Sequence, residues 1–221
     1  MKRSFPDKTK CSRPAAICLK FLDCLPRNRF KKGVTLLSKR ILILAGDAVE
    51  VLEVYYSYYR MLEEGYLPII ASPIRKILHT VVHDFEGWDT YTEKLGYQLG
   101  SHLSFSEVIP EEYDALIIPG GRAPEYIRMD RHIPRIVSHF FDTGKPVGVI
   151  CHGVLVLKAL RNKSYFAGRT MTTYPTLRFD VEDLGAIYTD QTPYVDGNIV
   201  SVKLWSDLSG FMREFLKLVR K

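Results

Sequence analysis

Cys151 stands where a catalytic nucleophile could act. Residues 147–150 are apolar or small and predict a short buried strand, which ends at Cys151, His152 and Gly153. The residues after Gly153 favour a helix, so we expect the chain to turn sharply from strand to helix at the cysteine. Such a turn lifts the side chain above the edge of the sheet. It also places the sulfur at a helix N-terminus, where backbone N–H groups lower the pKa of a thiol.

The alternative for Cys151 is a buried structural thiol, because unpaired cysteine is among the most buried residue types. The other cysteines, Cys11, Cys18 and Cys24, all lie near the N-terminus, so the remainder of the chain cannot form an internal disulfide. Their spacing matches no zinc motif, and we expect neither a metal nor a cofactor. A single cysteine in the main part of the chain fits a reducing compartment, and we expect a cytoplasmic protein.

A glycine-rich loop after the apolar run 115–118 is the second segment that could take part in chemistry. Gly120 and Gly121 lie at the carboxyl end of this predicted strand, where open α/β sheets bind their ligands. Their backbone N–H groups, with that of His152, suit a pocket for an oxyanion. A tight turn that needs glycine for its dihedral angles explains the same residues, and the two interpretations are compatible.

The positive charge of the chain is concentrated at its N-terminal end. Residues 1–38 hold ten Lys/Arg and two acidic residues and carry +8, whereas the whole chain carries +6 and the remainder therefore −2. The remainder gives no reason to expect nucleic-acid binding. We interpret residues 1–38 as a basic leader that is disordered or not native coding sequence, with translation starting at Val34 or Leu36; a mitochondrial transit peptide is less favoured. An intact mass that includes Met1 would contradict a later start.

Composition and hydrophobic patterning predict one α/β domain over residues 39–221. An apolar content of 46% and a charged content of 25% are ordinary for a soluble globular protein, and no apolar run is long enough to span a membrane. The apolar runs 41–45 and 67–71 predict buried parallel strands, and apolar residues between Val51 and Leu62 recur at helical spacing. This strand–helix–strand order begins a mostly parallel sheet, so we expect a three-layer α/β/α sandwich.

The remaining sequence extends the same pattern. Further strands are predicted at 77–82, 115–118, 171–173, 186–188, 194–195 and 199–202, and further helices at 106–112, 133–141, 177–184 and 208–219. The Asp-Gly-Asn sequence at 196–198 predicts a hairpin turn. Residues 83–88 are expected to form a loop or an excursion at the edge of the sheet, and no element is assigned to residues 89–105.

Two motifs resemble a known family. The sequence Ile-Pro-Gly-Gly-Arg-Ala-Pro-Glu-Tyr at 118–126, followed by Lys-Pro-Val-Gly-Val-Ile-Cys-His-Gly at 145–153, closely resembles the ThiJ/PfpI superfamily. The motifs and the turn at 196–198 occur in the family's order, and the similarity covers residues 39–220. The resemblance implies a flavodoxin-like fold of the class I glutamine amidotransferase type. It also implies a homo-oligomer, either a dimer or a hexamer.

The resemblance further implies roles for individual residues. Cys151 matches the nucleophile, and His152 matches the adjacent histidine of the PfpI and glyoxalase branches. Glu53 matches a glutamate that hydrogen-bonds the thiol; it must hold a proton to do so, because an ionised carboxylate repels a thiolate. Glu125 matches a glutamate that reaches the histidine of a neighbouring subunit. An ordinary first-turn glutamate and a surface histidine are the alternatives for Glu53 and His152.

A third segment resembles the plant two-domain glyoxalases of this family. It consists of the His-Asp-Phe-Glu-Gly sequence at 83–87 and the Tyr-Thr-Glu sequence at 91–93. His83 and Glu86 are therefore candidates for the substrate rim, although a loop that packs on a partner subunit is the favoured interpretation. Many relatives carry a His-Pro pair where this chain has Leu-Trp at 204–205, so any role of that histidine in substrate binding is lost or replaced.

The family includes glutathione-independent glyoxalases, proposed deglycases, intracellular peptidases, chaperones and oxidative-stress proteins. We expect an enzyme that acts on 2-oxoaldehydes such as methylglyoxal. Cys151 would add to the aldehyde, His152 or Glu53 would move a proton between adjacent carbons, and water would release a hydroxy acid. A PfpI-type peptidase or amidase is the alternative, and a redox sensor or holdase is a third. The first two need the same residues, so the sequence separates them only through the segment at 83–87, which favours the glyoxalase.

Overall fold

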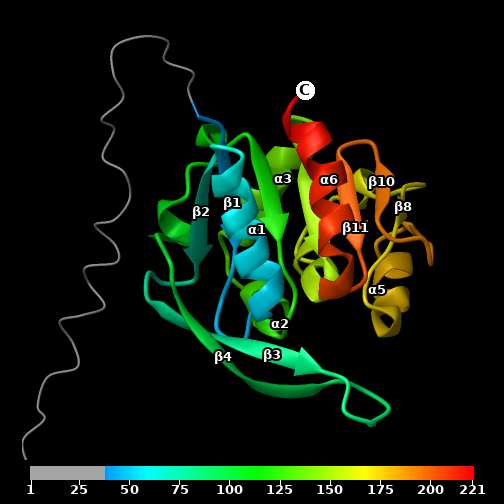
Figure 1. The fold of residues 1–221 in the computed structure, drawn as a ribbon. Coiled ribbons are helices and arrows are strands. Elements are labelled where there is room, and N and C mark those ends of the chain that lie inside the picture. Colours follow the sequence, from blue (N-terminus) through cyan, green and yellow to red (C-terminus); the bar gives the residue numbers. More distant parts are fainter. Residues whose placement is uncertain (1–37) are drawn as a thin grey trace, which may run out of the picture. The chain divides into compact units, whose positions relative to one another are not determined.

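A seven-stranded sheet forms the centre of the computed structural model, which describes residues 38–221 (Figure 1). Across the sheet the strands are β10 (Tyr194–Asp196), β11 (Ile199–Val202), β7 (Val147–Ile150), β6 (Ala115–Ile118), β1 (Arg40–Leu44), β2 (Leu67–Ser72) and β5 (Leu103–Ser104). Only β10 runs antiparallel to its neighbour. The order β2-β1-β6-β7-β11 is that of flavodoxin-like folds, as predicted. The predicted leader falls almost wholly outside the described residues.

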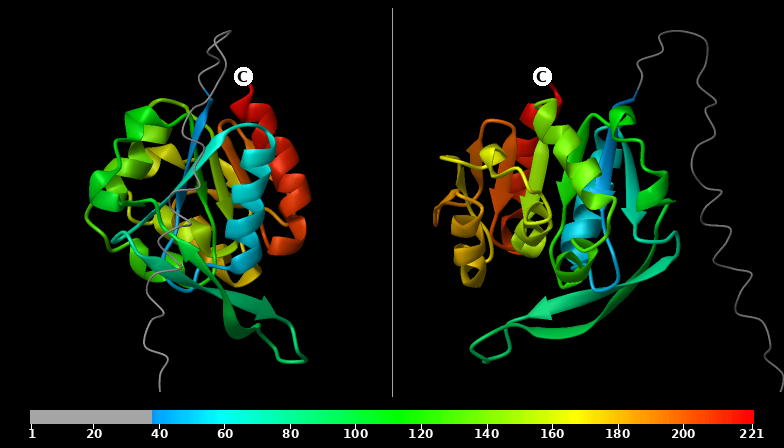
Figure 2. Two further views of the ribbon diagram at one scale, coloured as in Figure 1. Left: turned by 60° about the vertical axis from the view of Figure 1, so that its left-hand side comes forward. Right: turned by 180° about the vertical axis from the view of Figure 1, so that it is seen from behind.

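Alternation along β1 divides the hydrophobic core between two helical layers. The α-helices are α1 (Val51–Glu63), α2 (Ala123–Ile127), α3 (Ile133–Asp142), α4 (Val154–Leu157), α5 (Arg178–Asp183) and α6 (Leu208–Val219). Ile41 and Ile43 are buried with residues of α1 and α6, whereas Leu42 and Leu44 are buried with residues of α3. Figure 2 shows α1 and α6 on one side of the sheet and α3 on the other. The strand is therefore apolar on both faces, which explains its continuous apolar run and confirms the three-layer sandwich.

A long hairpin of β3 (Ile77–Asp84) and β4 (Thr92–Gly100) crosses beneath the carboxyl ends of the central strands (Figure 1). The prediction was wrong for this segment, since it missed β4 and placed the end of β3 in a loop; only residues 85–91 connect the strands. The physical reason is exposure. Of the residues in β4, Leu99 alone is buried, so no alternation between a core face and a solvent face marks the strand in the sequence.

Two other predicted helices are shorter than expected. Two 3₁₀ turns, Phe105–Glu107 and Pro110–Glu112, replace the helix predicted over 106–112, because Pro110 cannot take part in an uninterrupted helix. After Cys151 the chain forms one 3₁₀ turn and then α4, which is only one turn long and buried along its whole length. The hairpin turn predicted at 196–198 is confirmed by the β10–β11 pairing.

Two short strands, β8 (Thr170–Met171) and β9 (Ile187–Tyr188), form a small separate sheet near α5. Within residues 38–221, no helix has both the length and the hydrophobicity that crossing a membrane requires.

Candidate functional site

Cys151 occupies a constrained turn at the carboxyl end of β7. Its φ of 52° lies in the left-handed region, which non-glycine residues rarely adopt and which is common at functional sites. The hydroxyl of Thr173 donates a 2.6 Å hydrogen bond to the carbonyl of Cys151 and holds the turn. Gly153 follows where a β-carbon would lie 2.3 Å from the carbonyl oxygen of Ile118. The predicted sharp turn after the strand is therefore present, although a 3₁₀ turn precedes the helix.

The thiol of Cys151 is enclosed by protein. Only 4% of the residue is exposed, and this burial, followed by the charge of Glu53, raises the pKa of the thiol well above its ordinary value. The expectation that a helix N-terminus lowers this pKa is wrong for the resting chain, because α4 is one turn long and the sulfur is removed from water. Cys151 therefore rests as a thiol, and a base must remove its proton before it can attack a carbonyl.

His152 is placed to act as that base. Its Nδ1 lies 3.1 Å from the Sγ of Cys151. Burial, with a smaller effect of nearby His83, lowers the pKa of His152 to about 4, so the imidazole is neutral near neutral pH and can accept a proton. The ring of Tyr174 stacks on the imidazole at a centroid distance of 5.1 Å and fixes its orientation.

Glu53 reaches the same site from the first turn of α1. The side chain is fully buried, and burial, followed by the charge of Glu50, raises the pKa of its carboxyl well above its ordinary value. The backbone N–H of Gly120 donates a 2.5 Å hydrogen bond to Oε2 of Glu53, and the buried Oε1 has no hydrogen-bond partner among the described residues. A hydrogen bond from Glu53 to the Cys151 thiol therefore stays a prediction. The prediction that burial favours a protonated Glu53 is confirmed in direction.

Glu50 is a second buried carboxyl that sequence reasoning did not assign to the site. It caps α1 by accepting a 2.8 Å hydrogen bond from the backbone N–H of Glu53 through its Oε2. Burial raises the pKa of Glu50 to about 7. A glutamate three residues before Glu53, directly ahead of an apolar helix, was the signal that could have identified it.

The Glu50→Gln substitution is expected to remove a pH dependence of stability. Folding raises the pKa of Glu50 from 4.5 to about 7, so this carboxyl stabilises the native state fully below pH 4.5 and its contribution is lost as the pH rises through 7. Between about pH 5 and pH 8, the unfolding free energy of wild type should fall by about 2–3 kcal/mol more than that of Glu50→Gln. The glutamine side chain can still cap α1, so the cap itself is not lost in the variant. Urea unfolding at both pH values measures this difference, with exposed Glu111→Gln as the control. Parallel pH profiles for Glu50→Gln and wild type would contradict the assignment.

The two glycines of the loop after β6 are required by its geometry. A β-carbon on Gly120 would lie 2.8 Å from both the Cβ of Cys151 and the backbone nitrogen of His152. Gly121 has a φ of 75°, and a β-carbon there would lie 2.3 Å from the carbonyl oxygen of Ala48. The tight-turn interpretation is thus confirmed for Gly121, whereas Gly120 is required by the close approach of its neighbours. That the N–H groups of these glycines bind an oxyanion remains a prediction. For Gly120 to do so, its N–H must first give up its hydrogen bond to the Glu53 carboxyl.

Tyr91, in the connection between β3 and β4, lies beside the imidazole of His152. The hydroxyl of Tyr91 lies 3.4 Å from Nε2 of His152, opposite the nitrogen that faces the sulfur. His83, which is buried at the end of β3, stacks on Tyr91 with ring centroids 4.1 Å apart. Burial raises the pKa of Tyr91 to about 12, so its hydroxyl keeps its proton.

An ion pair ties the hairpin to the glycine loop. Glu93 of β4 accepts two hydrogen bonds from Arg122, from Nε at 2.7 Å and from Nη2 at 2.6 Å. Glu93 also lies 3.2 Å from Nε2 of His83. Sequence reasoning noted the segments that contain Tyr91, Glu93 and Arg122 but assigned these residues no role, because only the tertiary structure brings them together.

Two predicted site residues lie apart from the thiol in this chain. Glu86 is in the hairpin loop, where it pairs with Lys94 and accepts a 3.2 Å hydrogen bond from the hydroxyl of Thr92. Glu125 lies on α2 with an exposed side chain, and within residues 38–221 no hydrogen bond joins its carboxylate to His152. A role for Glu86 at a substrate rim and one for Glu125 across a subunit interface therefore stay predictions.

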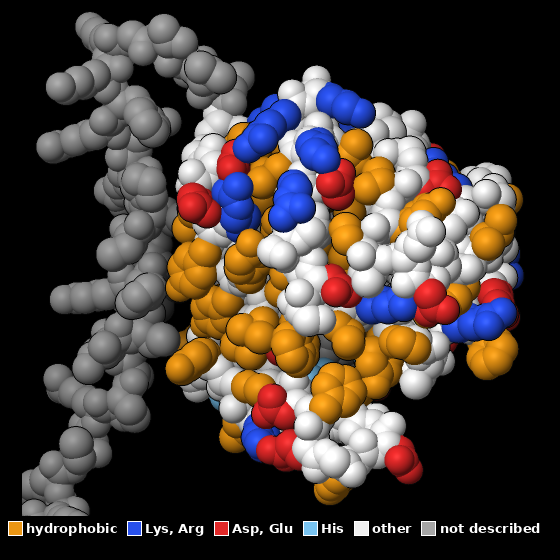
Figure 3. All heavy atoms as spheres, turned by 45° about the vertical axis from the view of Figure 1, so that its right-hand side comes forward, with side chains coloured by type: hydrophobic (Ala, Val, Ile, Leu, Met, Phe, Trp, Pro, Cys, Tyr) orange, Lys and Arg blue, Asp and Glu red, His pale blue; other side chains and the backbone are white. Residues whose placement is uncertain are grey.

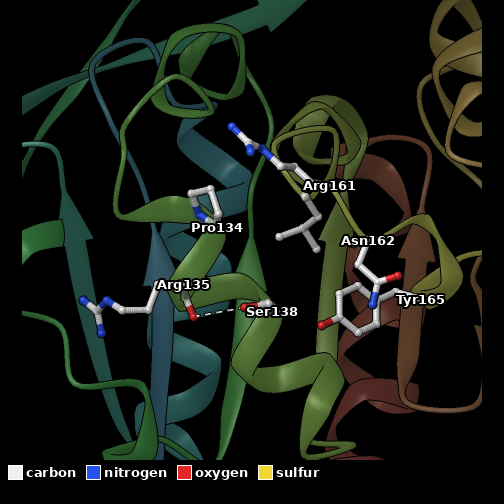
Figure 4. Close-up of a pocket in the computed structure, with 7 residues that line it drawn as sticks. Pro134, Arg135, Ser138, Arg161, Asn162 and Tyr165 are labelled. Atoms are coloured by element: carbon white, nitrogen blue, oxygen red, sulfur yellow. Dashed lines mark hydrogen bonds between the residues drawn. The ribbon is translucent and has the colours of Figure 1, made fainter.

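Two surface cavities lie elsewhere on the domain. The first, of about 270 Å³, lies between α3 and the segment after α4, where Arg135, Arg161 and Tyr165 are among its lining residues (Figure 4). The second, of about 470 Å³, includes Lys145 and Asn198 near the amino ends of β7 and β11. Neither cavity shares a residue with the site around Cys151. The described residues contain no cluster of three or more His, Cys, Asp or Glu side chains that could hold a metal ion.

Comparison with known proteins finds matches over nearly the whole described domain. The DJ-1/PfpI family model matches residues 39–218. A deglycase of Pyrococcus abyssi is 39% identical over 181 residues, which cover 82% of this chain and 99% of that protein. The DJ-1 homolog D of Arabidopsis thaliana is 35% identical over 193 residues, covering 84% of this chain and 49% of that protein. The solved structure of a ThiJ/PfpI domain protein from Brachyspira murdochii covers 82% of this chain and 96% of its own, with a TM-score of 0.70 and 20% identity, and shows the same fold.

Proposed function

Because the chain belongs to the DJ-1/PfpI family and its only described cysteine lies beside a neutral histidine and a buried glutamate, we propose that it is a cysteine-dependent enzyme acting on 2-oxoaldehydes such as methylglyoxal. The name of its archaeal relative, a deglycase, supports a substrate in which an aldehyde is free or has added to an amine. The observation that carries the proposal is the enclosed thiol with Nδ1 of His152 at 3.1 Å. A small carbonyl compound reaches such a thiol more readily than a polypeptide does.

The proposed reaction needs only groups of this site. The thiol proton of Cys151 moves to Nδ1 of His152, the sulfur attacks the aldehyde carbon, and His152 passes the proton on to the carbonyl oxygen to give a hemithioacetal. His152, neutral again, or Glu53 once it has given up its own proton, then removes the proton from the carbon bound to sulfur and returns a proton to the neighbouring carbon. The hydroxyl proton passes to the former ketone oxygen, and the product is a thioester of a hydroxy acid. Water hydrolyses the thioester and regenerates the thiol. No external oxidant or reductant enters the balance.

The test is conversion of methylglyoxal to lactate in the absence of glutathione, with Cys151→Ser as the control for non-enzymatic adduct formation. Lactate formed only by wild type supports the proposal. Two other assays on the same protein decide between the alternatives. Cleavage of short peptides that depends on Cys151 would favour a peptidase, and stoichiometric sulfinic acid at Cys151 without turnover would favour a redox sensor. Either result would contradict the proposal that a 2-oxoaldehyde is the substrate.

We further propose that the enzyme is a homo-oligomer, with no nucleic acid or membrane as partner. Hydrophobic side chains gather over part of the surface (Figure 3). Helix α1 exposes Leu52, Tyr56, Tyr59 and Leu62, and β4 exposes Leu95. Exposed apolar groups of this size are common where subunits meet. A cytoplasmic location is part of the same proposal, and cell fractionation would test it.

Glu125 is expected to contribute only within such an oligomer. Its carboxylate is exposed, so a neighbouring copy can reach it, and Glu125→Gln should lower kcat by about tenfold if it orients His152 of the partner. A variant made monomeric by charged substitutions on α1 should show the same loss. If the monomer retains full activity, Glu125 has no role across the interface.

A further inference from the structure

The imidazole of His152 has a protein group at each of its two nitrogens. Nδ1 lies 3.1 Å from the Sγ of Cys151, and Nε2 lies 3.4 Å from the hydroxyl of Tyr91. In other enzymes with a histidine base, a carboxylate usually holds the nitrogen that faces away from the nucleophile. No hydrogen bond among residues 38–221 joins a carboxylate to His152. Within the described chain it is therefore Tyr91 that faces Nε2, and the partner's Glu125 could act on His152 only beside this hydroxyl, at the same nitrogen.

Tyr91 is itself held by a defined set of contacts. Its ring stacks on His83 and meets Tyr174 edge-on, with a centroid distance of 5.6 Å to Tyr174. His83 lies 3.2 Å from Glu93, which is bound at both carboxylate oxygens by Arg122. Arg122 follows the glycine loop that lines the thiol. The two hydrogen bonds between Arg122 and Glu93 fix the direction as well as the distance of the contact. The pair therefore holds the hairpin, and with it Tyr91, close to the glycine loop.

We propose that Tyr91 is a positioning residue of this site, whose hydroxyl sets the proton distribution on His152, and that the Arg122–Glu93 pair holds the hairpin that carries it. When the phenol oxygen accepts the Nε2 proton, the lone pair of Nδ1 faces the thiol and can take its proton. The imidazolium formed by this transfer keeps its Nε2–H bonded to the same oxygen. This inference rests on the proposed cysteine chemistry and concerns its first step, the transfer of the thiol proton.

The protonation states at the site agree with this arrangement. The pKa of His152 is lowered to about 4 and that of Tyr91 is raised to about 12, both mainly by burial, so each is neutral near neutral pH. A neutral phenol can accept one hydrogen bond and donate another. The titratable groups that face His152 or Tyr91 from the surrounding elements are Cys151, His83, Glu93, Glu125, Tyr174 and Asp180. In Tyr91→Phe all of these remain, and only the hydroxyl is lost.

The test measures the alkylation rate of Cys151 by iodoacetamide as a function of pH, followed on the Cys151 peptide by mass spectrometry so that other cysteines do not interfere. Tyr91→Phe keeps the ring contacts. Near pH 7 it should react about threefold to tenfold more slowly than wild type, the range that one hydrogen bond is worth, with its profile shifted to higher pH. Glu93→Gln, which loosens the hairpin, should shift the profile in the same direction by a smaller amount.

Tyr97→Phe is the matched control, because it removes a phenol oxygen from an exposed position of the same hairpin, on β4. Its alkylation profile should equal that of wild type. A Tyr91→Phe profile that coincides with wild type in a protein of unchanged Tm would overturn the proposal, as would an equal shift in Tyr97→Phe. Alkylation needs no substrate, so this experiment can succeed even if the protein forms no lactate, and its failure leaves the proposed aldehyde substrate untouched.

Discussion

The Cys151→Ser variant is expected to lose at least about 10³-fold in kcat/KM for lactate formation from methylglyoxal. Serine has nearly the shape of cysteine and should keep the buried turn, including the hydrogen bond from Thr173 to the carbonyl of residue 151. Its hydroxyl is far less acidic than a thiol, however, and His152, whose pKa is lowered to about 4, is a weak base in the resting chain. Without the thiol there is no group that can form the proposed covalent adduct.

The measurement pairs initial rates of lactate formation with thermal unfolding of both proteins. An unchanged Tm shows that the lost rate reflects chemistry rather than folding. Mass spectrometry of the acid-quenched reaction adds a second observation, since only wild type should carry an adduct of the aldehyde on the Cys151 peptide. Activity within tenfold of wild type would remove Cys151 from the mechanism, and with it the proposed reaction.

The Gly120→Ala variant is expected to lose about 10²-fold or more in activity and about 1–3 kcal/mol in stability. The added β-carbon would lie 2.8 Å from the Cβ of Cys151, 2.8 Å from the backbone nitrogen of His152 and 2.9 Å from Oε2 of Glu53. All three belong to the site, and two of them are held by the backbone. The clash can be relieved only by moving the thiol or by breaking the hydrogen bond from the Gly120 N–H to Glu53.

Gly100→Ala provides the matched control for this substitution. A β-carbon there meets no atom within 4 Å, so the same chemical change should leave activity and stability near wild type. Lactate formation and urea unfolding of both variants give the comparison. If Gly120→Ala is as active as Gly100→Ala, the loop does not hold the reactive groups as tightly as its contacts indicate.

The sequence alone predicted the framework of the fold. The continuous apolar runs of β1, β6 and β7 indicated buried parallel strands, because a strand covered on both faces must be apolar at every position. The turn at Cys151 and the glycines of the loop after β6 followed from motifs only a few residues long, because a local pattern suffices to reveal a turn. Glu53 was identified only through the family resemblance, since its contact with Gly120 joins residues 67 positions apart.

The extent of the β3–β4 hairpin and the electrostatics of the thiol could not be predicted in this way. Most of β4 is exposed, so its sequence shows no alternation between buried apolar and exposed polar residues. The pKa of Cys151 depends on how completely the folded chain excludes water, and enclosure reversed the shift that a helix N-terminus alone would cause.

The sequence by itself determined which groups are available for chemistry, namely a thiol, an imidazole and a carboxyl at the ends of predicted elements. The tertiary structure decided how they are connected and protonated. Tyr91 meets His152 across 61 residues of chain, and Arg122 meets Glu93 across 29. Contacts over such separations depend on how strands and loops pack in the folded chain, so a pattern of neighbouring residues cannot predict them. Burial at those contacts sets the pKa values on which the proposed reaction depends.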